Sequence, residues 1–202
     1  MEWYHRFMNK TFEQWITNYI TEQKKAIDSI PVEKIKDLIN KLAEALKKDR
    51  QIFILGNGGS AANATHFAGD LGKSSSDATG RRFKVLTLND NMSWLTALGN
   101  DYTYEDVFVG QLQNYAKPKD ICIAISASGN SPNVVKTLVW AKKHQLQTIA
   151  IVGGKKGKLA EIADHTIVID STHVGRIEDA SMTALHLLCY AFIEHPEWAK
   201  IS

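Results

Sequence analysis

The stretch "QIFILGNGGSAANATHFAGDL", residues 51–71, joins an apolar run, a glycine-rich loop and a helical pattern in that order. We predict a strand over residues 51–55, a loop over 56–60 and a helix over 61–71. The apolar run is nearly continuous, which is typical of a strand buried on both faces. Such strands occur in parallel sheets that helices cover on both sides.

Short apolar runs of the same kind occur four more times along the chain. The further apolar runs are "FKVLTL" (83–88), "ICIAIS" (121–126), "TIAIV" (148–152) and "TIVID" (166–170). Helical patterns occupy residues 133–144, 158–163 and 177–193. This alternation predicts an α/β fold, a doubly wound, five-stranded parallel sheet flanked by helices. Ligands of such folds bind beyond the carboxyl ends of the strands, so the loops found there are the candidate binding elements.

Two amphipathic helices precede the first strand. Apolar side chains recur at three- and four-residue spacing from Phe12 to Ile20 and again from Ile35 to Leu46. Ser29 is predicted to cap the second helix, with Pro31 near its first turn. The pair packs either on its own core or on another subunit. We predict a single domain made of an N-terminal helical arm and an α/β core, residues 1–49 and 50–202.

Composition restricts the class of protein. The 24 Lys and Arg residues nearly balance the 22 Asp and Glu residues, with no concentrated basic stripe, so we expect no nucleic-acid partner. The lysine cluster at 153–158 is interpreted as a solvated loop. No apolar run approaches the ~20 residues that cross a membrane. Cys122 and Cys189 lie in apolar runs without a CxxC partner. We therefore expect buried thiols and a cytoplasmic protein.

The glycine loop "GNGGS" (56–60) favours a small anion or a polyhydroxyl chain. Gly56, Gly58 and Gly59 permit backbone conformations and close approaches that a Cβ would obstruct. Ser60 is placed to cap the following helix, whose free N–H groups favour an anion. The spacing is neither a dinucleotide fingerprint nor a Walker loop. The alternative interpretation is a purely structural turn.

A second polar loop, "SASGNSPN" (126–133), follows the third predicted strand. The hydroxyls of Ser126, Ser128 and Ser131, together with the N-terminal amides of the next helix, can hold a phosphate without an arginine. The alternative is an ordinary capped turn. Because both polar loops follow predicted parallel strands, binding is the better interpretation of the pair.

Titratable residues occur in two spaced pairs. His66 and Asp70 are four residues apart and share one face of their predicted helix. Glu178 and His186 are eight residues apart, about two helical turns. The spacing suits metal ligands or an acid–base pair. Taken one at a time, each histidine is equally compatible with a polar or core position that has no ligand.

Four segments in order resemble the sugar isomerase (SIS) domain family, and more narrowly its phosphoheptose isomerase branch. They are "GNGGSAANATHFAGDL" (56–71), "LGNDYTYEDVF" (98–108), "ISASGNSPNVVKTL" (125–138) and "GRIEDASMTALH" (175–186). The resemblance implies a flavodoxin-like fold and interconversion of D-sedoheptulose 7-phosphate and D-glycero-D-manno-heptose 7-phosphate through a metal-assisted enediol(ate) mechanism. It also implies a homotetramer with sites at subunit interfaces, in a pathway for surface polysaccharide, either lipopolysaccharide or capsule.

The resemblance further implies a set of site residues. A divalent metal, zinc in the family, would be held by His66, Asp70, Glu178 and His186, and catalysis would involve Asp70, Glu178 and His186. Substrate contacts would come from Asn57, Gly58, Gly59, Ser60, Asn100, Asp101, Ser126, Ser128 and Ser131. The polar segment that holds Asn100 and Asp101 could equally be an ordinary loop.

The chain departs from the family pattern at two of the four metal positions and at one further position in the serine loop. Asp70 stands where the family has glutamate, Glu178 where it has glutamine, and Ala127 where it often has threonine. Aspartate is shorter than glutamate by about 1.5 Å, which matters for a catalytic group. The second carboxylate at Glu178 offers a compensating base. Two alternatives follow, a non-catalytic adaptor of the replication-initiator-binding type and an isomerase of another ketose phosphate.

Overall fold

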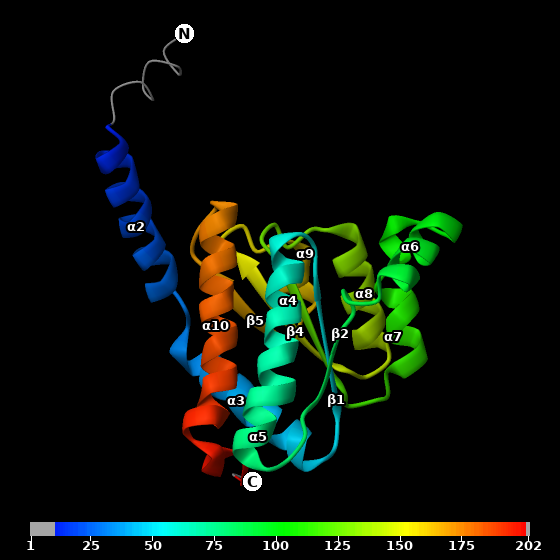
Figure 1. Cartoon of the computed structure of the whole chain (residues 1–202). Coiled ribbons are helices and arrows are strands. Elements are labelled where there is room, and N and C mark those ends of the chain that lie inside the picture. Colours follow the sequence, from blue (N-terminus) through cyan, green and yellow to red (C-terminus); the bar gives the residue numbers. More distant parts are fainter. Residues whose placement is uncertain (1–10, 201–202) are drawn as a thin grey trace.

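The computed structural model describes residues 11–200 and contains the five predicted strands in one parallel sheet (Figure 1). The strand order is β2-β1-β3-β4-β5, and every neighbouring pair is parallel. The strands are β1 (Gln51–Gly56), β2 (Lys84–Thr87), β3 (Ile121–Ser126), β4 (Gln147–Gly153) and β5 (His165–Ile169). This confirms the doubly wound sheet, and its order is the flavodoxin-like one. The chain reverses direction across the sheet between β1 and β3, where such folds bind ligands.

Alternate residues of β1, β3, β4 and β5 belong to different cores. In β1, Ile52 and Ile54 lie in one hydrophobic cluster, whereas Phe53 and Leu55 lie in the other. The first cluster includes residues of α3 (Val32–Lys47), α4 (Gly59–Gly69) and α10 (Val174–Glu194). The second includes residues of α7 (Val109–Tyr115), α8 (Pro132–Lys143) and α9 (Gly157–Ile162). Burial on both faces explains why the strands have continuous apolar sequences.

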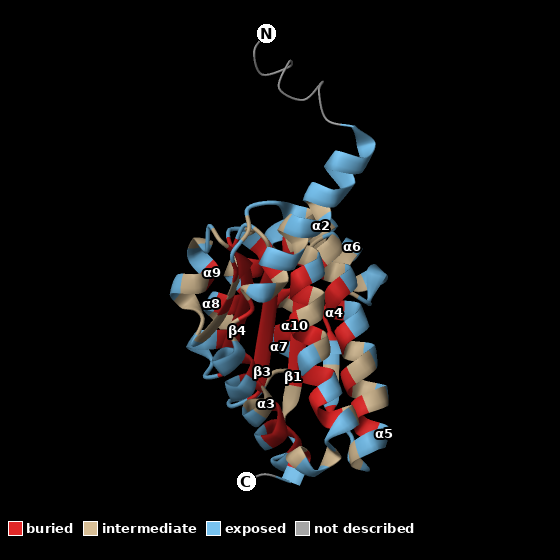
Figure 2. Cartoon of the chain, turned by 90° about the vertical axis from the view of Figure 1, so that its left-hand side faces the viewer, coloured by how far each residue is buried: buried red, intermediate tan, exposed pale blue. Residues whose placement is uncertain are grey.

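The two N-terminal helices differ in their packing. Helix α3 buries Ile35, Leu38 and Leu42 in the first core. Helix α2 (Phe12–Asp28) starts with a capping box between Thr11 and Gln14 and buries only Ala26, near its C-terminal end. The N-terminal half of α2 projects beyond the body of the domain (Figure 2). The arm residues before position 11 lie outside the described part of the chain.

The prediction that Ser29 caps the second helix is wrong. Ser29 is the C-cap residue of α2, and Pro31 is the N-cap residue of α3. The Ser29 hydroxyl donates to the carbonyl of Ala26 at 2.7 Å and accepts from the N–H of Asp170 at 2.9 Å. It therefore joins the arm to the end of β5, and this contact takes the hydroxyl away from the helix that follows.

Several short helical segments escaped the sequence analysis. Helix α6 (Met92–Asp101) has only exposed and half-buried residues, so its apolar pattern is weak. Part of the polar segment that follows forms the 3₁₀ turn η2 (Tyr104–Asp106). Helix α4 continues as a π-helix, η1 (Asp70–Ser75), and then as α5 (Ser76–Thr79). π-helical turns concentrate at functional sites, and this one begins at Asp70. A final 3₁₀ segment, η3 (Pro196–Lys200), closes the described chain.

The two cysteines are buried and unpaired, as predicted. Loss of hydration raises the pKa of the Cys122 thiol to about 12 and also raises the pKa of Cys189. Both thiols are therefore protonated and unreactive at neutral pH. Among the described residues, no helix has the length and apolar character needed to span a bilayer.

The two edges of the sheet are constructed differently. Strand β2 has four residues, and Lys84 at its start forms an ion pair with Asp49. Strand β5 forms the other edge, and α3 contacts it. The N–H of Asp170, just after β5, is taken by the Ser29 hydroxyl at the end of α2.

Candidate active site

The glycine loop turns into α4 two residues earlier than predicted. Gly58 has φ +56° and is the N-cap, so the helix begins at Gly59. The N–H groups of Ala61 and Ala62 already bond to the carbonyl of Gly58, at 3.0 and 3.2 Å. The prediction that Ser60 caps this helix is therefore wrong: Ser60 is buried inside the first turn. Glycine makes this possible because it adopts positive φ at no steric cost.

The three serines of the second loop converge directly after β3. The Oγ of Ser126 lies 3.4 Å from the Oγ of Ser128 and 3.3 Å from that of Ser131. Pro132 then begins α8, a helix of 12 residues. Three hydroxyls that meet at the start of a long helix can share an anion with the free backbone N–H groups there. The structure thus brings together the predicted phosphate-binding serines.

The lysine segment, residues 155–158, supports this serine loop. The N–H of Lys158 donates to Oδ1 of Asn130 at 3.0 Å, and the N–H of Leu159 donates to the carbonyl of Gly129 at 3.0 Å. A Cβ at Gly129 would collide with the backbone of Lys156, so only glycine fits there. The lysine side chains are exposed, as predicted for a solvated loop, but the backbone also fixes the serine loop.

His66, Asp70 and His186 meet where α4 and its π-helical continuation pack on α10. Nε2 of His66 lies 3.2 Å from Oδ2 of Asp70 and 3.2 Å from Nε2 of His186. Nε2 of His186 lies 3.7 Å from the same Asp70 oxygen. Among the described residues, these three form the group whose ligand atoms lie close enough to share a metal ion.

The spacing of these three atoms fits a zinc ion. Ligands about 2.0–2.1 Å from a tetrahedral Zn²⁺ lie about 3.3 Å from one another. The observed separations of 3.2, 3.2 and 3.7 Å are close to that value. Two imidazoles and a carboxylate are also the donor set that catalytic zinc sites use, with one position left open. The cluster is accessible, because the side chains of His66 and His186 are 52% and 41% exposed.

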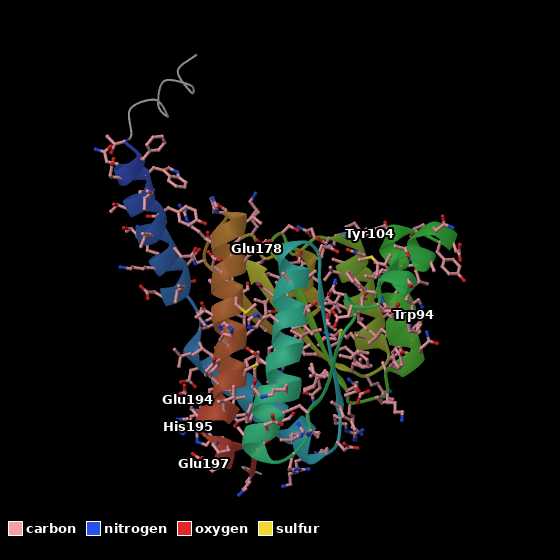
Figure 3. The ribbon with its side chains drawn as sticks, in the orientation of Figure 1. Trp94, Tyr104, Glu178, Glu194, His195 and Glu197 are labelled. Atoms are coloured by element: carbon pink, nitrogen blue, oxygen red, sulfur yellow. The ribbon has the colours of Figure 1, made fainter. Side chains whose placement is uncertain are left out.

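Glu178, the fourth predicted ligand, lies apart from this cluster. It is two turns nearer the start of α10, and its carboxylate packs against Gly59, where a Cβ would collide with it. The carbonyl of Glu178 accepts a 2.8 Å hydrogen bond from Nδ2 of Asn63, which joins α10 to α4. Figure 3 shows Glu178 at the end of the molecule toward which the strands point. Its carboxylate therefore faces the glycine loop.

A cavity of about 820 Å³ opens between the glycine loop and α6. Asn57 and Gly58 line one side of it, and Gly99 and Tyr104 line the other. Asn100 and Asp101 were predicted to contact the sugar, but they are exposed at the end of α6 and hydrogen-bonded to each other at 2.9 Å. Within one chain the structure does not bring them to this cavity.

Sequence reasoning missed several polar residues around these loops. Asn89, just after β2, bonds through its amide to both the N–H and the carbonyl of Gly56, at 3.2 and 2.8 Å. Asn133, in the first turn of α8, pairs with Asn57. Tyr104 contacts the same Asn57. Asn133 and Tyr104 both lie inside the family-like segments, which was the available signal for them.

Comparison with known proteins places this fold in a defined class. The SIS domain family matches residues 14–153, more than half of the chain. The solved phosphoheptose isomerase of Neisseria gonorrhoeae superposes with a TM-score of 0.83 at 29% identity, covering 91% of this chain and 100% of that one. A phosphoheptose isomerase of Francisella tularensis, 22% identical with a TM-score of 0.82, shares the fold. The fold and the loops are those of a sugar isomerase domain.

Relatives similar in sequence indicate a narrower group within the sugar isomerase domains. The phosphoheptose isomerase of Aquifex aeolicus is 38% identical over 169 residues, which cover 83% of this chain and 87% of the relative. That of Geotalea daltonii is 35% identical over 178 residues, covering 86% and 92%. The chain belongs to the SIS domain family, in its phosphoheptose isomerase branch.

Proposed function

We propose that this protein interconverts D-sedoheptulose 7-phosphate and D-glycero-D-manno-heptose 7-phosphate, for the synthesis of surface polysaccharide. The observation that carries the proposal is the convergence of His66, Asp70 and His186 at metal-ligand spacing, where α4 and η1 pack on α10. The names of the curated relatives supply the substrate class.

The His66, Asp70 and His186 cluster would hold the divalent ion, and we propose zinc because of the donor set and the spacing. A bound ion would polarise the oxygens on the two reacting carbons of the sugar. Glu178 lies about 12 Å from His186 along the axis of α10, so rotation of its side chain alone does not complete the predicted ligand set within one chain. In the described arrangement Glu178 is instead a second carboxylate beside the glycine loop.

Aldose–ketose isomerisation moves one proton between carbons 1 and 2 and another between the two oxygens that they bear. In our proposal Asp70 takes the proton from carbon 1 and returns it to carbon 2, and His186 moves the proton between the oxygens. If the shorter aspartate does not reach the carbon, Glu178 is the alternative base. The 3.7 Å separation of Asp70 from His186 supports the first assignment, whereas Glu178 packs against Gly59, about 12 Å from His186 along α10.

The distal part of the sugar phosphate would bind at the two loops. Ser126, Ser128 and Ser131 would hold the phosphate, helped by the N-terminus of α8. Sugar hydroxyls would bind at the glycine loop, through Asn57, Gly58, Gly59 and Ser60. Because Asn100 and Asp101 are exposed at the end of α6, we propose that they act in a site shared with a neighbouring subunit.

We propose a homotetramer whose subunits cover the histidine cluster. The outer half of α2 exposes Phe12, Trp15 and Ile20, an apolar face suited to a protein contact. A second subunit would also shield the half-exposed histidines from water. We place the enzyme in the cytoplasm, because buried unpaired thiols suit a reducing compartment.

The test is proton NMR of sedoheptulose 7-phosphate incubated with the zinc-loaded protein in deuterated buffer. We expect new anomeric signals of the aldose heptose 7-phosphate and deuterium at carbon 2 of the product. The matched control is Asp70→Asn, which keeps the size of the side chain and removes the base. Absence of product and of exchange in the folded, metal-loaded protein would refute the assignment. Turnover of another ketose phosphate would then identify a different sugar isomerase.

A further inference from the structure

A pair of amides joins the two loops of the candidate site. Nδ2 of Asn57 donates to Oδ1 of Asn133 at 2.9 Å, and Nδ2 of Asn133 donates to Oδ1 of Asn57 at 2.9 Å. Asn57 is in the glycine loop after β1, and Asn133 follows the serine loop after β3. The strands β1 and β3 are neighbours in the sheet. The pair therefore spans the position where the fold is expected to bind its ligand.

The orientation of both amides follows from one backbone group. Oδ1 of Asn133 also accepts a 3.0 Å hydrogen bond from the N–H of Val134. Because a backbone N–H can only donate, the Asn133 atom that faces it must be the oxygen. The Asn133 nitrogen must then face Asn57, so the Asn57 atom opposite it must also be an oxygen. Asn133 is 2% exposed, so water does not compete for these bonds.

The remaining capacity of Asn57 can now be counted. Its Oδ1 accepts from Nδ2 of Asn133 and from the hydroxyl of Tyr104, the latter at 3.4 Å. A carbonyl oxygen has two lone pairs, so both are used. Its Nδ2 has two hydrogens, of which Asn133 takes one. The side-chain amide of Asn57, a residue that lines the cavity, is left with one N–H for a ligand and no free acceptor.

We propose that Asn133 and Tyr104 are positioning residues that hold the Asn57 amide as a hydrogen-bond donor toward the sugar phosphate. The proposal rests on the function proposed above and adds a selection rule to it. The Asn57 amide donates a hydrogen bond to an acceptor oxygen of the sugar, either a carbonyl or a hydroxyl oxygen. It cannot accept a hydrogen bond from a sugar hydroxyl. The same network fixes the distance between the sugar-binding and phosphate-binding loops.

A double-mutant cycle tests whether Tyr104 acts through Asn57. Tyr104 is 66% exposed, so Tyr104→Phe removes one hydroxyl without disturbing the core. We expect Tyr104→Phe to lower kcat/KM about threefold to tenfold in the wild-type background, and by less than twofold in the Asn57→Ala background. A direct contact between Tyr104 and the sugar would instead give equal losses in both backgrounds, and that result would overturn the proposal.

A second measurement is independent of turnover. The side-chain amide signals of Asn57 in ¹H–¹⁵N NMR are identified by their loss in Asn57→Ala. We expect one of the two Asn57 protons to exchange slowly with water and its signal to shift in Tyr104→Phe. The exposed Asn40 on α3 serves as the comparison. If both Asn57 protons exchange as fast as those of Asn40, the amide is not held and the proposal fails, whether or not the protein isomerises a sugar.

Discussion

The serine loop and the histidine cluster are two parts of one candidate site, yet they are held in place differently. The serine loop contains the 5% exposed Ser126 and the exposed Ser128, and the backbone of the lysine segment bonds to its Asn130. The side chains of His66 and His186 are 52% and 41% exposed on the outer faces of two helices. Backbone contacts therefore fix the serine loop, whereas the histidine cluster, which is the reacting end in the proposed function, is open to solvent in the described chain. Water exclusion at the reacting end must come from substrate or from another subunit.

Removing a ligand from the histidine cluster should have the largest effect. We expect His186→Ala to lower kcat at least about 100-fold, because it removes both a metal ligand and an acid–base group. Bound zinc, measured by elemental analysis, should fall with activity. The affinity for inorganic phosphate, measured by calorimetry, should stay unchanged if the serine loop is independent.

The matched control is His195→Ala. His195 follows the C-terminal end of α10, at the end of the molecule opposite Glu178 and beside Glu194 and Glu197 (Figure 3). It stacks on Trp198 and is not part of the histidine cluster. It should leave zinc content and turnover at the wild-type level. A His186→Ala protein that keeps its zinc and its rate would show that the cluster is not the metal site.

A substitution in the serine loop should have a smaller effect of a different kind. Ser128→Ala removes one of three converging hydroxyls, and a hydrogen bond to a charged group contributes about 1.5–3 kcal/mol. We expect KM for the sugar phosphate to rise about tenfold or more, with kcat and zinc content nearly unchanged. Ser93→Ala on the exposed face of α6 is the control. A fall in kcat at constant KM would contradict a phosphate-binding role.

The smallest effect is expected from a substitution of Glu178, which tests whether this carboxylate takes part in metal binding or catalysis. Glu178→Gln keeps the shape of the side chain against Gly59 and removes its charge. Because this carboxylate lies outside the cluster, zinc content should be unchanged and kcat should fall less than about tenfold. Loss of zinc would mean that Glu178 is a ligand after all. A loss of kcat as large as that of His186→Ala would make Glu178 the base.

The sequence was most informative where burial or helical spacing determined both the residue types and the structure. Burial on both faces made the strands β1, β3 and β4 visible as apolar runs, and the observed bounds of all five strands lie close to the predicted ones. The four-residue spacing of His66 and Asp70 correctly put both on one helical face. Helix α6 was missed because packing imposes no apolar stripe on it.

Sequence spacing predicts which side of a helix two residues share, but shared sides do not imply that the residues are close along the helix axis. Glu178 and His186 share one side of α10, but eight residues at 1.5 Å each separate them by about 12 Å along the axis. This is why Glu178 lies beside the glycine loop and His186 beside Asp70. The two serine caps failed for a related reason. Where a helix begins depends on the backbone angles of Gly58 and on the position of Pro31, which residue type alone does not determine.

The sheet edges limit how this chain can associate with itself. An exposed strand edge is a template for another chain and a starting point for aggregation. Here one edge is four residues long and begins with the ion-paired Lys84. At the other edge, the backbone N–H that follows β5 is already bonded to Ser29. Growth of the sheet by an added strand is therefore disfavoured at the short β2 edge, and beyond β5 the N–H of Asp170 is not free to pair with an incoming strand.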